Sequence, residues 1–272
     1  MTDNRRLWSG PYIIWSAGFI LLPLLMVIYY GMTNGDGSFT WANLAAFADP
    51  IHYRAFINSV VIAFGSTLFC LLLAYPLALI LGRRKGKNTD ILIMIFIIPM
   101  WINFLLRILA LQMILSNTGI LNALLEFLGL APVHLMYSRT AIMIGMVYDY
   151  LPFMILPIYT TLSKLDGSLR EAAMDLGADK VQTFLQVTLP LSVPGIVSGV
   201  SMVFLPAMTN YVVLDMLYNS TYIMGSLIGS YFAAYNWHGG SMIALILLAI
   251  ICLFTLLTSN GEENGERGGA LL

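Results

Sequence analysis

The sequence predicts an all-α polytopic membrane protein, and its composition and its apolar runs carry that prediction. Hydrophobic residues make up 59% of the 272 residues and charged residues only 10%, whereas soluble domains are about one quarter charged. The mean hydropathy is +0.83. A helix needs about 20 mainly apolar residues to cross the hydrocarbon core. Six runs meet this need, and together they predict one membrane domain over residues 1–258. They lie near residues 11–32, 56–82, 91–115, 138–162, 191–217 and 240–258.

The first run follows two arginines, and Pro11 suits its first helical turn. Its apolar length exceeds that of a signal-peptide core and no clear cleavage site follows, so we expect an uncleaved span. Between the third and fourth runs, residues 116–137 predict a hairpin with Gly and Pro as helix breakers. Residues 223–235 are too polar to span and predict an interfacial helix. Residues 259–272 have the composition of a disordered tail.

Positive charge predicts the orientation of the spans, because cytoplasmic loops carry the excess of Lys and Arg. Only Arg54 and Arg139 fall on one side of the predicted membrane. Both termini are therefore expected in the cytoplasm, together with the long polar segment at 163–190. The positive residues of that side are Arg5, Arg6, Arg83, Arg84, Lys85, Lys87, Lys164, Arg170, Lys180 and Arg267.

The polar segment before the fifth run predicts two short helices with a break between them. Ser168 can cap the first helix, and Glu171 completes a capping-box pattern. Gly177 can end that helix and Asp179 can cap the second. Pro190 predicts a change of direction into the fifth span. On periodicity alone, an ordinary cytoplasmic loop and a docking surface remain equally open.

The residues of this segment resemble the EAA loop of ABC-importer permeases. The pattern is Glu-Ala-Ala, three residues, Gly, nine residues, an aliphatic residue, one residue, then Leu-Pro, and it fits residues 171–190 with Val187 where Ile is usual. The resemblance implies the type I ABC-importer permease fold, in which this loop is a coupling helix held in a groove of the ATPase subunit. The coupling residues that it implies are Glu171, Ala172, Ala173, Asp175, Gly177, Leu189 and Pro190.

Ionisable groups inside membrane spans are costly and suggest a function. Arg107, Asp149 and Asp215 are such groups. Asn103 lies four residues before Arg107, and Tyr211 lies four before Asp215, so each pair should share one helix face. One interpretation is structural: Arg107 pairs with Asp149 to hold two spans together, and Asp215 is solvated at the outer interface.

The other interpretation is a polar path between subunits, and the sequence leaves the two equally open. Acidic groups and aromatic faces suit a cationic amine through charge pairing and cation–π contact. Arg107 opposes such a substrate unless an acid neutralises it. The path would be lined by Trp101, Asn103, Arg107, Tyr148, Asp149, Tyr211 and Asp215.

Three stretches, 98–122, 146–184 and 205–215, resemble spermidine/putrescine permeases of the PotB type. The Trp-x-Asn-x-x-x-Arg pattern at 101–107 favours PotB over the sister PotC type. The resemblance implies a multi-pass subunit of the bacterial cytoplasmic membrane that works by alternating access. Its implied partners are membrane lipids, a PotC-like permease, a PotA-like ATPase dimer that binds the ATP, and a PotD-like substrate-binding protein.

Other functions are weighed against this one. The Gly82-to-Asn88 stretch lacks the glycine spacing and the final Ser or Thr of a phosphate-binding loop, and no catalytic or metal-binding motif is present. We therefore expect no enzyme activity, cofactor or metal on this chain. The net charge of −1 implies no nucleic-acid partner. A permease for another solute, such as ferric iron or an anion, stays open, and so does a non-transporting membrane scaffold.

Overall fold

The computed structural model describes residues 11–12, 14–41, 43, 49–83, 87–218 and 222–269. Within these ranges the regular structure is helical, apart from one isolated bridge between Thr33 and Phe39. In chain order the helices are η1 (Ala17–Leu21), α2 (Leu22–Met32), α4 (Pro50–Arg83), α5 (Lys87–Trp101), α6 (Phe104–Leu115), α7 (Ile120–Phe127), α8 (Arg139–Lys164), α9 (Gly167–Asp175), α10 (Lys180–Thr183), η3 (Phe184–Thr188), α11 (Leu189–Thr209), α12 (Tyr211–Leu217), α13 (Met224–Ala233) and α14 (Trp237–Gly269).

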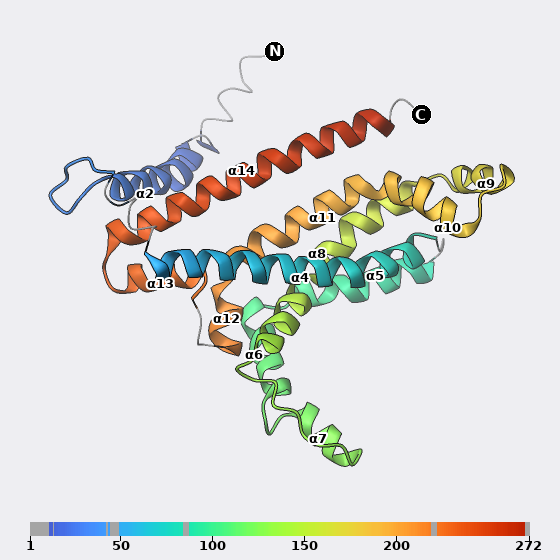
Figure 1. The fold of residues 1–272 in the computed structure, drawn as a ribbon, viewed down its shortest axis with the longest axis horizontal. Coiled ribbons are helices and arrows are strands. Elements are labelled where there is room, and N and C mark those ends of the chain that lie inside the picture. The colour runs from blue at the N-terminus through green and yellow to red at the C-terminus, as the bar shows by residue number, and fades with distance from the viewer. Residues whose placement is uncertain are drawn as a thin grey trace.

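Helices α4, α8 and α11 pack against one another and form the core of the molecule (Figure 1). Small residues let them approach closely. Ala63, Ala74 and Ala78 of α4 are fully buried. On α11, a Cβ at Gly195 would lie 2.8 Å from Thr161 Cβ of α8, and one at Gly199 would lie 2.8 Å from Met154 Sδ. Small interfacial residues are how membrane helices gain packing contact where lipid removes the hydrophobic driving force.

The first and last spans lie side by side, at the edge of this core (Figure 1). Gly31 of α2 faces Leu245 of α14, with a Cβ position only 2.6 Å from the leucine Cδ1. Helix α13 coincides with the interfacial helix predicted for 223–235. Residues 259–269 of the tail predicted to be disordered are helical, as the end of α14, and residues 270–272 lie outside the described residues.

The third apolar run is not one straight helix. The predicted span 91–115 divides into α5, which ends at Trp101, and α6, which begins after its N-cap Asn103. Its Oδ1 accepts hydrogen bonds from the amides of Leu105 (2.9 Å) and Leu106 (3.4 Å). Asn103 therefore does not share a helix face with Arg107, contrary to the sequence expectation. Helix α7 forms inside the predicted hairpin, and α6 and α7 project from the body as an arm (Figure 1).

The fifth apolar run is divided in the same way. The predicted span 191–217 becomes α11 and α12, and Asn210 lies at the break with its Oδ1 accepting from the amide of Val213 at 3.4 Å. Six helices in the described ranges are long and apolar enough to cross a membrane, the third of them over Phe104–Phe127. The number of spans is as expected, but the third is displaced: the long apolar helix is Phe104–Phe127, and Ile91–Trp101 is a shorter apolar helix. A capping asparagine divides the predicted third run and the predicted fifth run.

The contact between α8 and α11 yields a test. We expect Gly195→Val to destabilise the purified protein by about 1–3 kcal/mol, because the added methyl groups meet Thr161 and force the helices apart. The melting temperature in detergent measures this. Gly229→Val is the matched control, since a Cβ there meets nothing within 4 Å. Equal melting temperatures for the two variants would contradict this packing.

Candidate functional site

Two regions contain the residues singled out from the sequence, and the first is the segment from α9 to η3. Asp166 caps α9, accepting from the Ser168 amide at 3.0 Å, so the predicted cap at Ser168 is wrong by two residues. Gly177 ends this helix with φ +92°, a conformation that side chains disfavour. Asp179 caps α10 as predicted, in a capping box with Gln182.

Pro190 does not turn the chain, contrary to the sequence expectation. Helix runs without interruption over Lys180–Thr209. The proline ring lacks an N–H and crowds the carbonyl of residue i−4, which is Gln186. That carbonyl lies within the π-helical turn η3, Phe184–Thr188. In a π-helix each amide donates to the carbonyl five residues earlier instead of four, so the α-helical pattern is replaced just before Pro190. Helices α10 and η3 are therefore continuous with the fifth span, whereas α9 is separated from them by the turn at Gly177.

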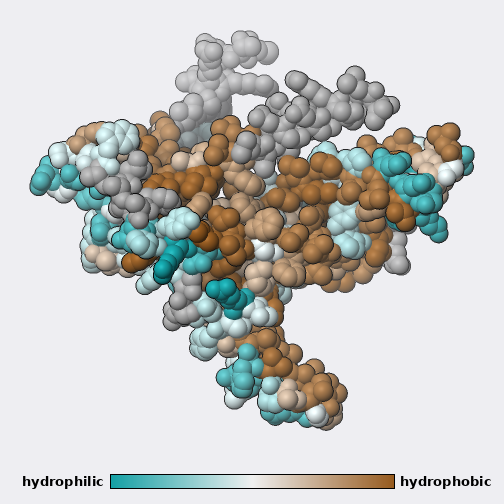
Figure 2. Space-filling model, in the orientation of Figure 1, coloured by the Kyte–Doolittle hydropathy of each residue, from teal (hydrophilic) through white to brown (hydrophobic). Residues whose placement is uncertain are grey.

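Helix α9 lies at one end of the long axis of the molecule (Figure 1). Its hydrophilic residues form part of a polar patch at that end (Figure 2). Glu171, Ala172, Asp175 and Gly177 are exposed, Ala173 is half-buried, and Leu176 beyond the helix is 90% exposed. This exposed helix therefore suits docking against another protein. It offers small alanine side chains, carboxylates and, just beyond its end, the exposed Leu176. Further along, Leu189 is half-buried and Pro190 exposed, both on the continuous helix.

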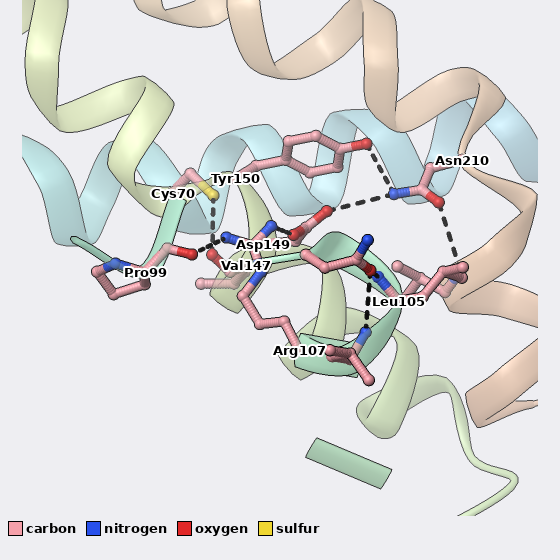
Figure 3. Close-up of polar contacts among 11 residues, drawn as sticks. Cys70, Pro99, Leu105, Arg107, Val147, Asp149, Tyr150 and Asn210 are labelled. Atoms are coloured by element: carbon pink, nitrogen blue, oxygen red, sulfur yellow. Dashed lines mark hydrogen bonds and ion pairs between the residues drawn. The ribbon is translucent and has the colours of Figure 1, made fainter. Parts of the chain in front are cut away.

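The second region is a buried polar cluster at the two helix breaks (Figure 3). Arg107 of α6 forms an ion pair with Asp149 of α8, and their side chains are 6% and 4% exposed. Arg107 Nη1 also donates to the Pro99 carbonyl of α5 at 3.2 Å. Asn210 Nδ2 donates to Tyr150 Oη at 2.8 Å and lies 3.5 Å from Asp149 Oδ2. The ends of α5 and α11 are thereby tied to α6 and α8.

A hollow of about 450 Å³ opens beside this cluster. Its lining contains both members of the ion pair, whose charges cancel, and the other lining side chains are mostly apolar. The structure therefore offers a cavity of low net charge at the helix breaks. Its lining residues are Met100, Ile102, Phe104, Arg107, Asp149, Tyr150, Phe153, Pro206, Thr209 and Asn210.

The structure brings together only part of the predicted substrate path. Arg107 and Asp149 pair, as the structural interpretation expected, and Tyr148 lies nearby with its ring 5.8 Å from Arg107 Cζ. Trp101 is 87% exposed at the end of α5. Tyr211 and Asp215 are also exposed, and neither lines the hollow. Both lie four residues apart on α12, so the expected shared helix face is present for this pair.

Sequence reasoning missed Asn210 and Tyr150. Both are uncharged, so the search for ionisable groups within spans passed over them. A polar amide inside an apolar run, as at Asn210, was the available signal. Among the described residues, no group of three His, Cys, Asp or Glu could hold a metal ion. His52, which the sequence did not single out as a site residue, is buried in α4 with Nε2 2.9 Å from Tyr231 Oη.

Comparison with known proteins identifies the family. Residues 74–260 match the family described as binding-protein-dependent transport system inner membrane component. The chain is 38% identical to the spermidine/putrescine transport system permease protein PotB of Salmonella typhimurium, over 89% of this chain and 88% of the relative. This chain belongs to the PotB-like permeases of that family. The PotB of Escherichia coli K12 is 37% identical over 89% of this chain and 92% of its own length.

Solved structures agree on the fold. A chain of a bacterial alginate ABC transporter, solved with an alginate-bound periplasmic protein, superposes with a TM-score of 0.78 at 18% identity. The superposition covers 94% of both chains. The expected ABC-importer permease fold is therefore confirmed, and the chain is a multi-pass inner-membrane transport subunit rather than an enzyme.

The ion pair yields a test of its role. We expect Asp149→Leu to destabilise the protein by about 3–5 kcal/mol, because Arg107 would stay buried without its counter-charge. The double variant Arg107→Met/Asp149→Leu should recover most of that loss. Thermal stability in detergent, read by size-exclusion chromatography, measures both. A double variant as unstable as the single one would contradict a structural pair.

Proposed function

We propose that this chain is the PotB-like permease subunit of an ATP-driven importer of polyamines. The observation that carries the proposal is the 38% identity to a spermidine/putrescine permease over nearly the whole of both chains. The exposed α9 helix adds support, because a transport subunit driven by a separate ATPase needs a surface on which that ATPase can act. The polar cluster between broken helices adds a second feature expected of a transport path.

The proposed partners follow from this assignment. A PotC-like permease would complete the membrane path, and a PotA-like ATPase dimer would bind and hydrolyse ATP. A PotD-like protein would deliver the polyamine from outside. Both termini and α9 are proposed to face the cytoplasm, on the positive-inside argument. Among the arginines and lysines used in it, Arg5, Arg6, Arg84 and Lys85 lie outside the described residues.

The geometry supports a mechanism for the coupling. The helix Lys180–Thr209 has 30 residues, and at about 1.5 Å per residue it spans roughly 45 Å. It begins beside α9 and ends at Asn210, which contacts Asp149 and Tyr150. A displacement of α9 by the closing ATPase dimer would therefore move the far end of this helix against the Arg107–Asp149 pair. Pro194 and Pro206 are places where the helix can bend.

The substrate path is proposed to form between this chain and the second permease. Trp101, Tyr148, Tyr211 and Asp215 are exposed in the isolated chain and offer aromatic faces and one free carboxylate. A polyamine carries several ammonium groups, and both features attract them. Asp149 would not attract the ammonium groups by itself, because Arg107 already neutralises its charge.

An anionic solute is the second candidate, and one observation favours it. Nε of Arg107 is buried and has no hydrogen-bond partner among the described residues. That N–H group lies beside the hollow and is a donor to which an anion there can hydrogen-bond. Competition separates the candidates: unlabelled putrescine should reduce radiolabelled spermidine uptake by the assembled importer, while ferric iron and anions should not.

The coupling role of Gly177 yields a further test. We expect Gly177→Asp to abolish ATP-dependent spermidine uptake while the protein still inserts, because a side chain at φ +92° distorts the turn that positions α9. Uptake in proteoliposomes with all partner subunits measures transport, and membrane fractionation measures insertion.

Gly129→Asp is the matched control for that variant. Gly129 has φ +74° and, like Gly177, open space around its Cβ position, but it lies beyond α7. The same backbone strain there should leave uptake largely intact. Wild-type uptake by Gly177→Asp, or equal losses in both variants, would contradict the coupling role.

A further inference from the structure

A pocket of about 610 Å³ lies beneath α9, where the end of α4 meets α10 and η3. Its charged lining consists of Arg83, Arg170, Lys180 and Glu171. Three cations and one carboxylate give a net charge of +2. Within the described part of the chain, the one ion pair is Arg107–Asp149, so none of these three cations is paired there. The pocket therefore carries unbalanced positive charge contributed by three separate helices.

Two buried hydroxyl groups line the same pocket. Thr183 is 6% exposed and Thr188 is 2% exposed, and both Oγ1 atoms lack a hydrogen-bond partner among the described residues. A helical threonine commonly donates to the carbonyl one turn earlier, as Thr67 does to Ala63 at 2.7 Å. A buried hydroxyl without a partner is destabilising. A bound acceptor in the pocket would satisfy both groups.

We propose that this pocket binds the phosphate group of an anionic phospholipid. Phosphate oxygens accept hydrogen bonds from hydroxyl, guanidinium and ammonium groups, which are the donors present. The pocket lies at the ends of two membrane spans, Pro50–Arg83 and Lys180–Thr209. Leu79 and Phe184 add an apolar wall for the glycerol and the first methylenes. Basic pockets between transmembrane helices are established sites for anionic headgroups.

The bound headgroup would connect the coupling helix to the core. Arg83 belongs to α4, Arg170 to α9 and Lys180 to α10, so one phosphate contacting all three would hold these helices together. Anionic lipid would then stiffen the link between α9 and the long helix to Asn210. The inference takes the orientation from the proposed function, which places the pocket at the inner leaflet. Glu171 lines the edge of the pocket and is exposed, so it stays available to a protein partner.

The test is lipid binding by the purified, fully assembled importer. Native mass spectrometry after detergent extraction should show retained phosphatidylglycerol. Titration with phosphatidylglycerol should give saturable binding, and phosphatidylcholine should not. We expect Arg83→Gln, and separately the double variant Thr183→Val/Thr188→Val, to weaken that binding about fivefold to tenfold. Lys164→Gln is the control, since it removes a cation from the end of α8, which does not line the pocket.

The threonine variant should keep its melting temperature in lipid-free detergent, because it removes only unpaired hydroxyl groups.

The possible results distinguish a phospholipid from free phosphate in the pocket, and a failure of this proposal from a failure of the proposed function. Equal binding by wild type and both pocket variants would overturn the proposal. Inorganic phosphate that binds the pocket without any phospholipid preference would overturn the lipid as its source. Lipid that enters only after the ATPase subunits are removed would show a protein occupant instead. Lost spermidine uptake with intact lipid binding would remove the proposed function alone.

Discussion

The buried ion pair between Arg107 and Asp149 is the contact on which the middle of this structure depends. Either charge alone inside the membrane domain would cost several kcal/mol. Each also makes a second contact: Arg107 with the Pro99 carbonyl in the last turn of α5, and Asp149 with the side-chain amide of Asn210, just beyond α11. The two helix breaks therefore lie together because one pair of charges has to be satisfied.

The core packing and this polar cluster depend on each other. Gly195 and Gly199 allow α11 to lie against α8, and that approach sets where Asn210 reaches Tyr150 and Asp149. The same helix extends in the other direction to α10, beside the exposed helix α9. One continuous helix thus runs from the exposed region around α9 to the buried polar cluster at Asn210. A continuous, packed helix of this kind is one physical route by which two distant sites can be coupled.

The isolated chain leaves much apolar surface uncovered. Phe19 and Leu25 near the first span, Met94 on α5 and Phe127 on the projecting arm are more than half exposed. Large apolar areas cover much of the face shown in Figure 2. Lipid tails solvate such surface in a membrane, and the rest is available to a second permease. The arrangement agrees with a subunit that functions inside a larger membrane assembly.

Much of this protein was determined by its sequence alone. Apolar run lengths predicted the number of spans, because hydrocarbon thickness sets how many residues a helix needs, but they placed the third span too early in the chain. The Glu-Ala-Ala pattern with Gly177 singled out the segment proposed for coupling, and Asp179 marked its second helix through local capping. These properties depend on near neighbours in the chain. The breaks at Asn103 and Asn210 were missed. The hydropathy of an apolar run is nearly the same whether it forms one helix or two helices divided by a capping asparagine.

Only the tertiary structure decided how the polar residues combine. Arg107 and Asp149 are 42 residues apart, and nothing in their spacing fixes whether they pair with each other or face a substrate. The fold brings them into contact while leaving Asp215 and Trp101 exposed. The helix likewise continues through Pro190 because of the π-helical turn before it, and the local sequence did not predict that turn. Long-range contacts select among the states that local sequence permits, so the roles of these residues appear only once the helices are packed.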